Sequence, residues 1–400
     1  MATLNYIGSK KSLLSFIDYV LKKVNNKFEK TNNIKFLDGF AGSGIVGKHF
    51  NKKYGYNVFS NDMEDYSYIL SYALLKVEYS EKVKNIIEDL NNLTEPIDKD
   101  NYNLITKYYS EKGVDKRKFW TIKNSEKADA IIENIKTKLN NKSITKDEYI
   151  FIMASLLSSL DKYANTTSVY GAYLKNYKSS SLKDFELKAI HNDEKIININ
   201  KNKVYNLDVN SETITNDKYD ITYFDPPYNN RQYSSNYHPL NFITKYDSTL
   251  LPYGKTGLLE NSNKSDYSIS KNVEWAFKSL IEMLSVSKST STKIGFKPSC
   301  TIGHKDVDQQ IAGIKISSFS LSFFLYRGLT NKDNINKFAE DPELTINAYF
   351  APTLLANFFS KFLVILLMVN CLLFKTLIPS FKSLFVKALS NNGYFIYLFD

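Results

Sequence analysis

The sequence predicts an α/β fold with a parallel sheet, on three observations. A short apolar run at 34–37 ends in Asp38, and a Gly-rich turn and a helical pattern follow it. A second apolar run ends in an acid, Asp62, and a third, at 221–224, ends at the letters DPPY. A strand, a Gly-rich turn, a helix and a second strand that ends in an acid form a Rossmann-like βαβ unit.

Composition narrows the class of protein. A chain of 400 residues is long enough for two or three domains. Its formal charge of +10 and its pI of about 9.1 favour an anionic partner such as nucleic acid. Two cysteines, Cys300 and Cys371, and four scattered histidines predict no disulfide framework and no metal site. The N-terminus lacks the apolar core of a signal peptide, so we expect a cytoplasmic protein of bacterial type that has no membrane segment.

The remaining elements follow in chain order. After Ser9, apolar residues recur on one helical face, and residues 45–50 open a second helix. Between about 71 and 200 the chain becomes rich in Lys and Asn, with helical stretches among the polar ones. One of these helices carries a capping box, Thr145-x-x-Glu148, before an apolar run. We interpret this region as a mostly helical insertion into the α/β unit.

These patterns predict a discontinuous catalytic domain, at 1–70 and 200–284, around an inserted region at 71–199. The segment 285–400 is an atypical tail, rich in Ser, Phe and Leu, whose fold the sequence does not define. Within this tail, 314–324 has the alternation of a strand. The apolar run at 362–374 is only thirteen residues long, so it predicts a buried helix or strand rather than a membrane span.

The Gly-rich turn resembles a nucleotide-binding loop. Gly42-x-Gly44-x-x-Gly47 fits the dinucleotide fingerprint, and Asp62 lies twenty residues beyond Gly42, where an acid would bind a ribose. The pattern is compatible with NAD, with FAD and with S-adenosylmethionine. It is also compatible with a tight turn that binds no ligand.

The DPPY sequence suits methylation of an exocyclic amine on a base. The amino lone pair of adenine is delocalised into the ring, so this nitrogen is a poor nucleophile. Asp225 and the carbonyl of Pro226 could accept its two N–H groups, which would aim the lone pair at a methyl donor. Pro226 and Pro227 fix the backbone, and Tyr228 could stack on a base that has been taken out of the helix.

The chain resembles the Dam-like DNA adenine methyltransferases of restriction–modification systems. The resemblance covers roughly residues 1–284, in the family's order. Its motifs are NYIGSKKSLL (5–14), FLDGFAGSGIVG (36–47), SND (60–62), DKYANTTSVYGAYLK (161–175), VYNLDV (204–209) and DPPYNNRQYSSNYH (225–238). This family has an α/β sheet that binds S-adenosylmethionine, with a DNA-recognition insert between the cofactor and catalytic motifs.

The resemblance also implies roles for individual residues. Four catalytic positions carry over: Asp225, Pro226, Pro227 and Tyr228. Seven positions would bind the cofactor: Tyr6, Lys10, Asp38, Gly42, Gly44, Asp62 and Asp208. Of these, Asp62 would accept hydrogen bonds from the ribose hydroxyls, and Asp208 would contact the adenine of the cofactor.

Two polar segments are candidates for DNA contact, because such side chains supply phosphate contacts and base-edge hydrogen bonds. The candidates are Asn165, Tyr170, Lys175, Arg231, Tyr233 and Asn236. The expected function is site-specific methylation of the adenine N6 in duplex DNA by base flipping, with a cognate restriction endonuclease as a possible partner. Cytosine or RNA methylation remains an alternative, as does a catalytically impaired DNA-binding remnant. The sequence does not reveal the recognition site or the oligomeric state.

Overall fold

A computed structural model gives the architecture. It describes residues 4–25, 33–113, 115–227, 231–260, 262–286, 311–316 and 321–326. The chain divides into two compact units, Met1–Phe323 and Phe324–Asp400, and almost all described residues belong to the first. The apolar run at 362–374 lies outside the described residues.

The core of the first unit is a mixed sheet with the strand order β3-β2-β1-β4-β5-β6. The strands are β1 (Lys35–Asp38), β2 (Asn57–Asn61), β3 (Lys203–Tyr205), β4 (Ile221–Phe224), β5 (Ile311–Ile316) and β6 (Leu321–Tyr326). The first four are parallel, and β5 pairs antiparallel with β4. The α/β class and the strands at β1, β2 and β4 are therefore confirmed. The predicted tail contributes β5 and β6.

Both faces of the sheet are covered. Phe36 of β1 packs in a cluster with α1 (Leu14–Asn25) and α2 (Ile45–Tyr54). Leu37, the next residue, packs on the opposite face with α11 (Val273–Val286). This alternation follows from the pleat of a strand, and apolar residues at both positions are typical of a buried parallel sheet.

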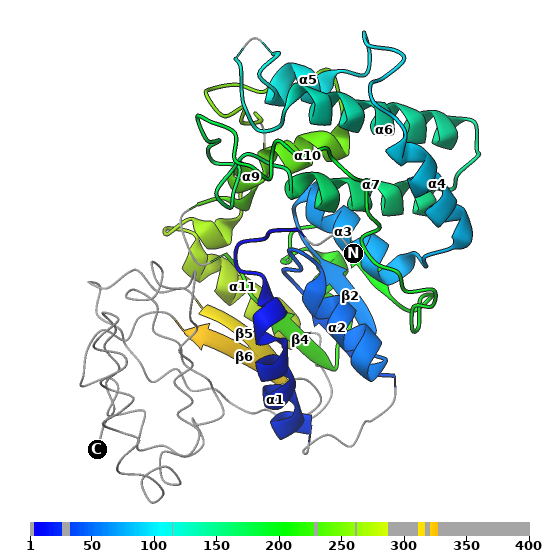
Figure 1. Cartoon of the computed structure of the whole chain (residues 1–400). Helices are drawn as coiled ribbons and strands as arrows, with labels where there is room; N and C mark the ends of the chain where they lie inside the picture. Colours follow the sequence, from blue (N-terminus) through cyan, green and yellow to red (C-terminus); the bar gives the residue numbers. More distant parts are fainter. Residues whose placement is uncertain are drawn as a thin grey trace, which may run out of the picture. The chain divides into compact units, whose positions relative to one another are not determined.

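The remaining helices form a second layer with its own apolar core. They are α3 (Asp65–Lys76), α4 (Glu81–Asn91), α5 (Leu104–Tyr109), α6 (Ile122–Asn140), α7 (Lys146–Asp161), α9 (Tyr233–Asn236) and α10 (His238–Lys245). The short elements η1 (Lys10–Leu13), α8 (Glu212–Thr215) and η2 (Asp266–Ser268) complete the described helices. Figure 1 shows α4 to α7 grouped with α10 beyond one end of the strands.

The helical layer is not made only from the predicted insertion. Its core includes Tyr66 on α3, which precedes 71–199, and Leu240 on α10, which follows that range. Helix α7 lies at the centre of this layer and is buried from Ile150 to its end. The predicted capping box begins this helix. The Oγ1 of Thr145 accepts from the amide of Glu148, and the carboxylate of Glu148 accepts from the amide of Thr145. The inserted helices therefore share their core with α3 and α10, which extend beyond the predicted insertion.

Asp129 on α6 organises part of this layer. Its buried carboxylate accepts from the amides of Ile105 and Thr106 at the start of α5, and from the hydroxyl of Tyr246. An Asp129→Ala change would leave these donors buried without acceptors, and each such donor costs about 1–3 kcal/mol. We expect the free energy of unfolding to fall by about 2–4 kcal/mol in urea titrations. The exposed Asp100→Ala variant is the control, and equal midpoints for the two variants would contradict this role.

Candidate active site

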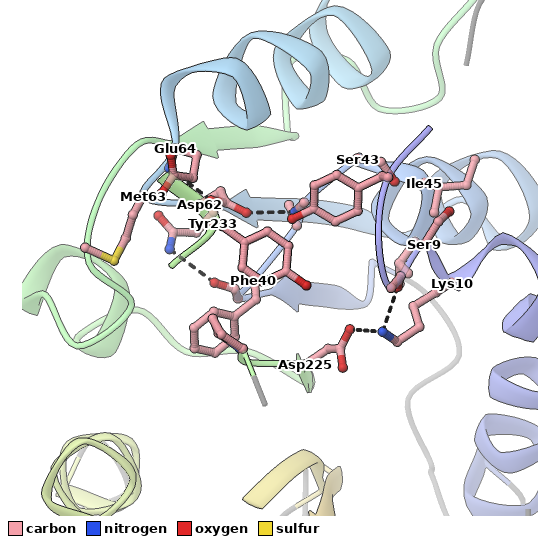
Figure 2. Close-up of a pocket in the computed structure, with 18 of the residues that line it drawn as sticks. Ser9, Lys10, Phe40, Ser43, Ile45, Asp62, Met63, Glu64, Asp225 and Tyr233 are labelled. Carbon is pink, nitrogen blue, oxygen red and sulfur yellow. Dashed lines mark hydrogen bonds and ion pairs between the residues drawn. The ribbon is translucent and has the colours of Figure 1, made fainter. Parts of the chain in front are cut away.

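A pocket lies at the carboxyl ends of β1, β2 and β4 (Figure 2). This is the edge at which open α/β sheets bind ligands. Three segments form most of its lining: the N-terminal stretch from Tyr6 to Lys10, the turn between β1 and α2, and the end of β2. Seven of the predicted site residues meet here, namely Tyr6, Lys10, Gly42, Asp62, Asp225, Pro227 and Tyr233.

The turn between β1 and α2 requires glycine. Gly42 and Gly44 have φ angles of +54° and +72°, which side chains other than glycine rarely adopt. A Cβ on Gly42 would lie 2.7 Å from Cε1 of Tyr6. The amide of Ala41 donates to the carbonyl of Asn61, at 2.9 Å, so the turn is also fixed to the end of β2. The backbone can thus approach a ligand closely.

The carboxylate of Asp62 fixes this turn through hydrogen bonds to backbone amides. Its Oδ2 accepts from the amide of Gly42 at 2.7 Å, and its Oδ1 accepts from the amide of Glu64 at 3.0 Å. Burial raises the pKa of this carboxyl. Each carboxylate oxygen has a second lone pair, so Asp62 keeps acceptor capacity toward the pocket.

Asp38 lies at the end of β1, completely buried. Its Oδ2 accepts from the amide of Gly47 in the first turn of α2, at 3.1 Å. Its Oδ1 has no partner among the described residues. Burial, together with the carboxylates of Asp225 and Asp62, raises the pKa of Asp38 to about 7.

One wall of the pocket is aromatic. Tyr6 stacks against both Tyr233 and Tyr237, with ring centroids 5.5 and 5.1 Å from its own, and these two rings lie 6.1 Å from each other. The amide of Ile7 donates to the hydroxyl of Tyr237, and the amide of Asn5 donates to Asp161 on α7. The N-terminal segment is therefore held on the helical layer while its side chains reach the sheet.

Asp225 forms an ion pair with Lys10, whose Nζ also donates to the carbonyl of Gly8 (Figure 2). Sequence reasoning assigned Lys10 to the cofactor pocket and Asp225 to catalysis, without a contact between them. Pro226 is buried behind Asp225, and Pro227 lines the pocket. Tyr228 lies outside the described residues.

The other predicted positions differ from expectation. Asp208 is exposed, and its Oδ1 accepts from the amide of Asn210, while Val209 beside it lines the pocket. Asp38 and Gly44 lie behind the lining residues. These three positions therefore stay predictions as cofactor contacts.

The candidate DNA contacts separate into buried and exposed residues. Asn165 is buried and binds the backbone of Leu174 and Lys178, and the hydroxyl of buried Tyr170 donates to Asp161. These two side chains are committed to the fold, which does not fit the predicted DNA contact. Asn236 is almost buried in α9, and Tyr233 belongs to the aromatic wall. Lys175 and Arg231 are exposed.

Sequence reasoning missed Glu64. It lines the pocket, is only 7% exposed, and accepts from Nδ2 of Asn241 on α10 at 2.5 Å. Oδ1 of Asn241 accepts from the amide of Tyr66, so one amide side chain joins α10 to the start of α3. Burial raises the pKa of Glu64 to about 8. The only signal in the sequence is an acid two residues after Asp62, and the spacing rule for the ribose-binding acid selects Asp62 alone.

Two negative findings apply to the described part of the chain. Its side chains include no group of three or more His, Cys, Asp or Glu that could hold a metal ion. None of its helices combines the length and the apolar character needed to cross a bilayer.

The fold and the site define an α/β enzyme with a nucleotide-type pocket, and comparison with known families makes this specific. Residues 6–294 match the family described as D12 class N6 adenine-specific DNA methyltransferase. The chain belongs to this family, and it is an adenine-specific DNA methyltransferase. No solved structure matches it.

Curated relatives agree with this assignment. The chain is 38% identical over 279 residues to the type II methyltransferase M.NlaIII of Neisseria lactamica. The aligned residues cover 70% of this chain and 79% of the relative. It is 36% identical over 285 residues to the type II methyltransferase M.CviAII of Paramecium bursaria Chlorella virus 1, covering 71% and 81%. It is 32% identical over 352 residues to the modification methylase StsI of Streptococcus sanguinis, covering 85% of this chain and 51% of the relative.

The buried carboxyls predict a dependence of stability on pH. The pKa values of Asp38 and Glu64, about 7 and about 8, exceed their ordinary values. The folded chain therefore binds more protons than the unfolded chain between about pH 4 and 8, so the free energy of unfolding falls as pH rises there. Burial lowers the pKa of His191 and of His238, so these two residues oppose this fall, but only up to about pH 7.5, where unfolded histidine is deprotonated. We expect a lower melting temperature at pH 8.5 than at pH 6.5.

Scanning calorimetry of the ligand-free protein checks this expectation. Glu64→Gln and Asp38→Asn should each reduce the difference between the two pH values, because a neutral side chain does not titrate. The exposed Glu212→Gln variant should leave it unchanged. A parent protein that melts at the same or a higher temperature at pH 8.5 would contradict the prediction.

Proposed function

We propose that this pocket binds S-adenosylmethionine and that the end of β4 presents the N6 amine of a flipped adenine to it. The observation that supports this most is the presence of Asp62 and Asp225 in the lining of one pocket, beside a glycine turn. The methyl donor supplies an electrophilic methyl group on a positively charged sulfur. The relatives are named type II methyltransferases and modification methylases, so we also propose that this enzyme modifies DNA beside a cognate endonuclease.

The donor set of the pocket fits a cationic ligand that carries a ribose. Asp62 would accept from the ribose hydroxyls, since a carboxylate is a natural bidentate acceptor. Asp38 lies buried behind the lining, and the charge of its carboxylate would stabilise the ammonium of the methionine part. A cation would also offset the mutual repulsion of Asp38, Asp62 and Asp225, which raises the pKa of Asp38. Gly42 has no side chain, so the ring of Tyr6 can pack directly against this turn.

Asp225 would act on the adenine amine. It would accept one N–H and stabilise the positive charge that develops on the nitrogen as the new N–C bond forms. Without substrate, Lys10 neutralises Asp225. The amine would then compete with the Lys10 ammonium for the carboxylate, and the carbonyl of Gly8 keeps Lys10 close in either case. Tyr228 would stack on the flipped base.

The first test concerns cofactor affinity. Asp62→Ala should weaken S-adenosylmethionine binding by about 1.5–3 kcal/mol, the range for hydrogen bonds to a charged group. Isothermal titration with the parent and with Glu212→Ala, an exposed acid on α8, supplies the comparison. Urea titration of each variant establishes that it is folded. Equal affinities for parent and Asp62→Ala would remove Asp62 from the ribose site.

The second test concerns the chemical step. Asp225→Asn keeps the size of the side chain, but it removes the charge and replaces one acceptor with an NH₂ donor. Loss of one such electrostatic contact lowers the rate by about a hundredfold or more. Single-turnover methyl transfer to duplex DNA should show this loss, and S-adenosylmethionine affinity should stay within about twofold, because Asp225 faces the base.

The outcome of the second test separates the alternatives. If Asp225→Asn transfers methyl groups at the parent rate, the end of β4 is not the catalytic site. A parent chain that binds the cofactor yet methylates no adenine in DNA would favour the impaired remnant.

A further inference from the structure

A short hairpin follows α10. Tyr253 and Leu258 exchange two backbone hydrogen bonds, each 2.9 Å long, and enclose a four-residue loop. The first and last loop residues, Gly254 and Gly257, have φ angles of +66° and +78°, so glycine suits both positions. The sequence marks this stretch, YGKTG, only as a turn.

Buried polar groups fix this turn, although it lies on the surface. Nη2 of Arg117 donates to the carbonyl of Gly254 at 2.9 Å, and the hydroxyl of Tyr109 donates to the carbonyl of Gly257 at 2.9 Å. Arg117 is only 2% exposed, and its charge is paired with Asp115 at 2.6 Å. A fully buried arginine is rare unless it is paired, so the fold commits a costly group to holding these carbonyls. The hairpin is therefore rigidly attached.

The same hairpin is joined to the wall of the active site. Nε2 of His238 lies 2.8 Å from the carbonyl oxygen of Thr256, and its Nδ1 lies 2.8 Å from that of Ser235 in α9. Burial and the charge of Arg117 lower the pKa of His238, so the neutral ring donates to one of the two carbonyls at a time. His238 directly follows Tyr237 of the aromatic wall. The hairpin thus has a fixed position relative to the pocket.

The hairpin exposes side chains suited to nucleic acid. Lys255 at its tip is exposed and has no acidic partner among the described residues. Tyr253 is 48% exposed and Leu251 before it is 67% exposed, and large apolar side chains with this exposure are few in the described part.

We propose that the hairpin Pro252–Leu258 is a preformed contact to duplex DNA, with Lys255 on a backbone phosphate and Tyr253 against sugar or base. The proposal rests on the proposed function, because it places this contact on the DNA whose adenine enters the pocket. The exposed lysine at the tip and the net charge of +10 favour a polyanion over a protein partner. Rigid attachment keeps the entropic cost of binding low.

The experiment compares Lys255→Ala with Lys146→Ala. Lys146 is an exposed lysine that opens α7, so it lies at the opposite end of α6 from the Arg117 anchor. Fluorescence anisotropy with a random-sequence duplex, from 50 to 200 mM KCl, gives the dissociation constant and its salt dependence without any need for methyl transfer. Loss of one phosphate contact should reduce the salt slope by about 0.9 and weaken binding about eightfold at 0.1 M salt.

Tyr253→Ala provides a second readout, since it removes contact area without removing charge. Its affinity should fall about tenfold with an unchanged salt slope. S-adenosylmethionine affinity should equal that of the parent in all three variants. If Lys255→Ala and Tyr253→Ala both bind DNA as tightly as Lys146→Ala does, the hairpin is not a DNA contact. The two proposals can fail separately. If the hairpin variants weaken DNA binding but Asp225→Asn transfers methyl groups at the parent rate, only the proposed catalytic site is wrong.

Discussion

The register between β1, β2 and β4 determines which side chains reach the pocket. Asp38 is paired with Ser60 of β2 on one side and with Tyr223 of β4 on the other. Asp62 and Asp225 each lie two residues beyond these partners, so both emerge at the same level of the sheet edge. Because side chains alternate along a strand, a slip of one residue would move the apolar set of a strand to the wrong face and carry its terminal acid away from the site. Burial of Phe36 on one face and Leu37 on the other fixes this register.

This convergence creates an electrostatic conflict within the protein itself. Asp62, Glu64 and Asp225 line the pocket with Asp38 behind them, and burial raises the pKa of Asp38, Asp62 and Glu64. Among the described residues that line the pocket, Lys10 is the basic one, and it pairs with Asp225. The amides of Gly42 and Gly47 offset part of the remaining charge. A site arranged in this way favours a cation. Asp225 is paired with a lysine side chain, whereas Asp38 and Asp62 accept hydrogen bonds from backbone amides.

Local patterns predicted what depends on local physics. The strands of the βαβ unit, the glycine turn and the capping box at Thr145 are all set by neighbours in sequence, and the structure confirms them. The stack of Tyr6, Tyr233 and Tyr237 joins residues more than two hundred positions apart, and no periodicity reveals it. The same reason explains why Glu64 was missed, because its partner Asn241 belongs to a distant helix. The limits of the insertion were also hidden, since α10 completes the helical core only in three dimensions.

Polarity of side chains was a poor guide to the DNA-facing surface, for a physical reason. The segment 162–202 contains neither helix nor strand, so its buried backbone must find other hydrogen-bond partners. Asn165 satisfies two backbone groups of this segment, and the hydroxyl of Tyr170 is used on Asp161. Polar residues in a buried loop are thus consumed by the fold itself. The hairpin at Lys255 shows the opposite arrangement, since Arg117, Tyr109 and His238 supply its hydrogen bonds from the interior and leave its own side chains on the surface. When buried side chains form hydrogen bonds with the backbone of a surface element, the side chains of that element remain available for a partner.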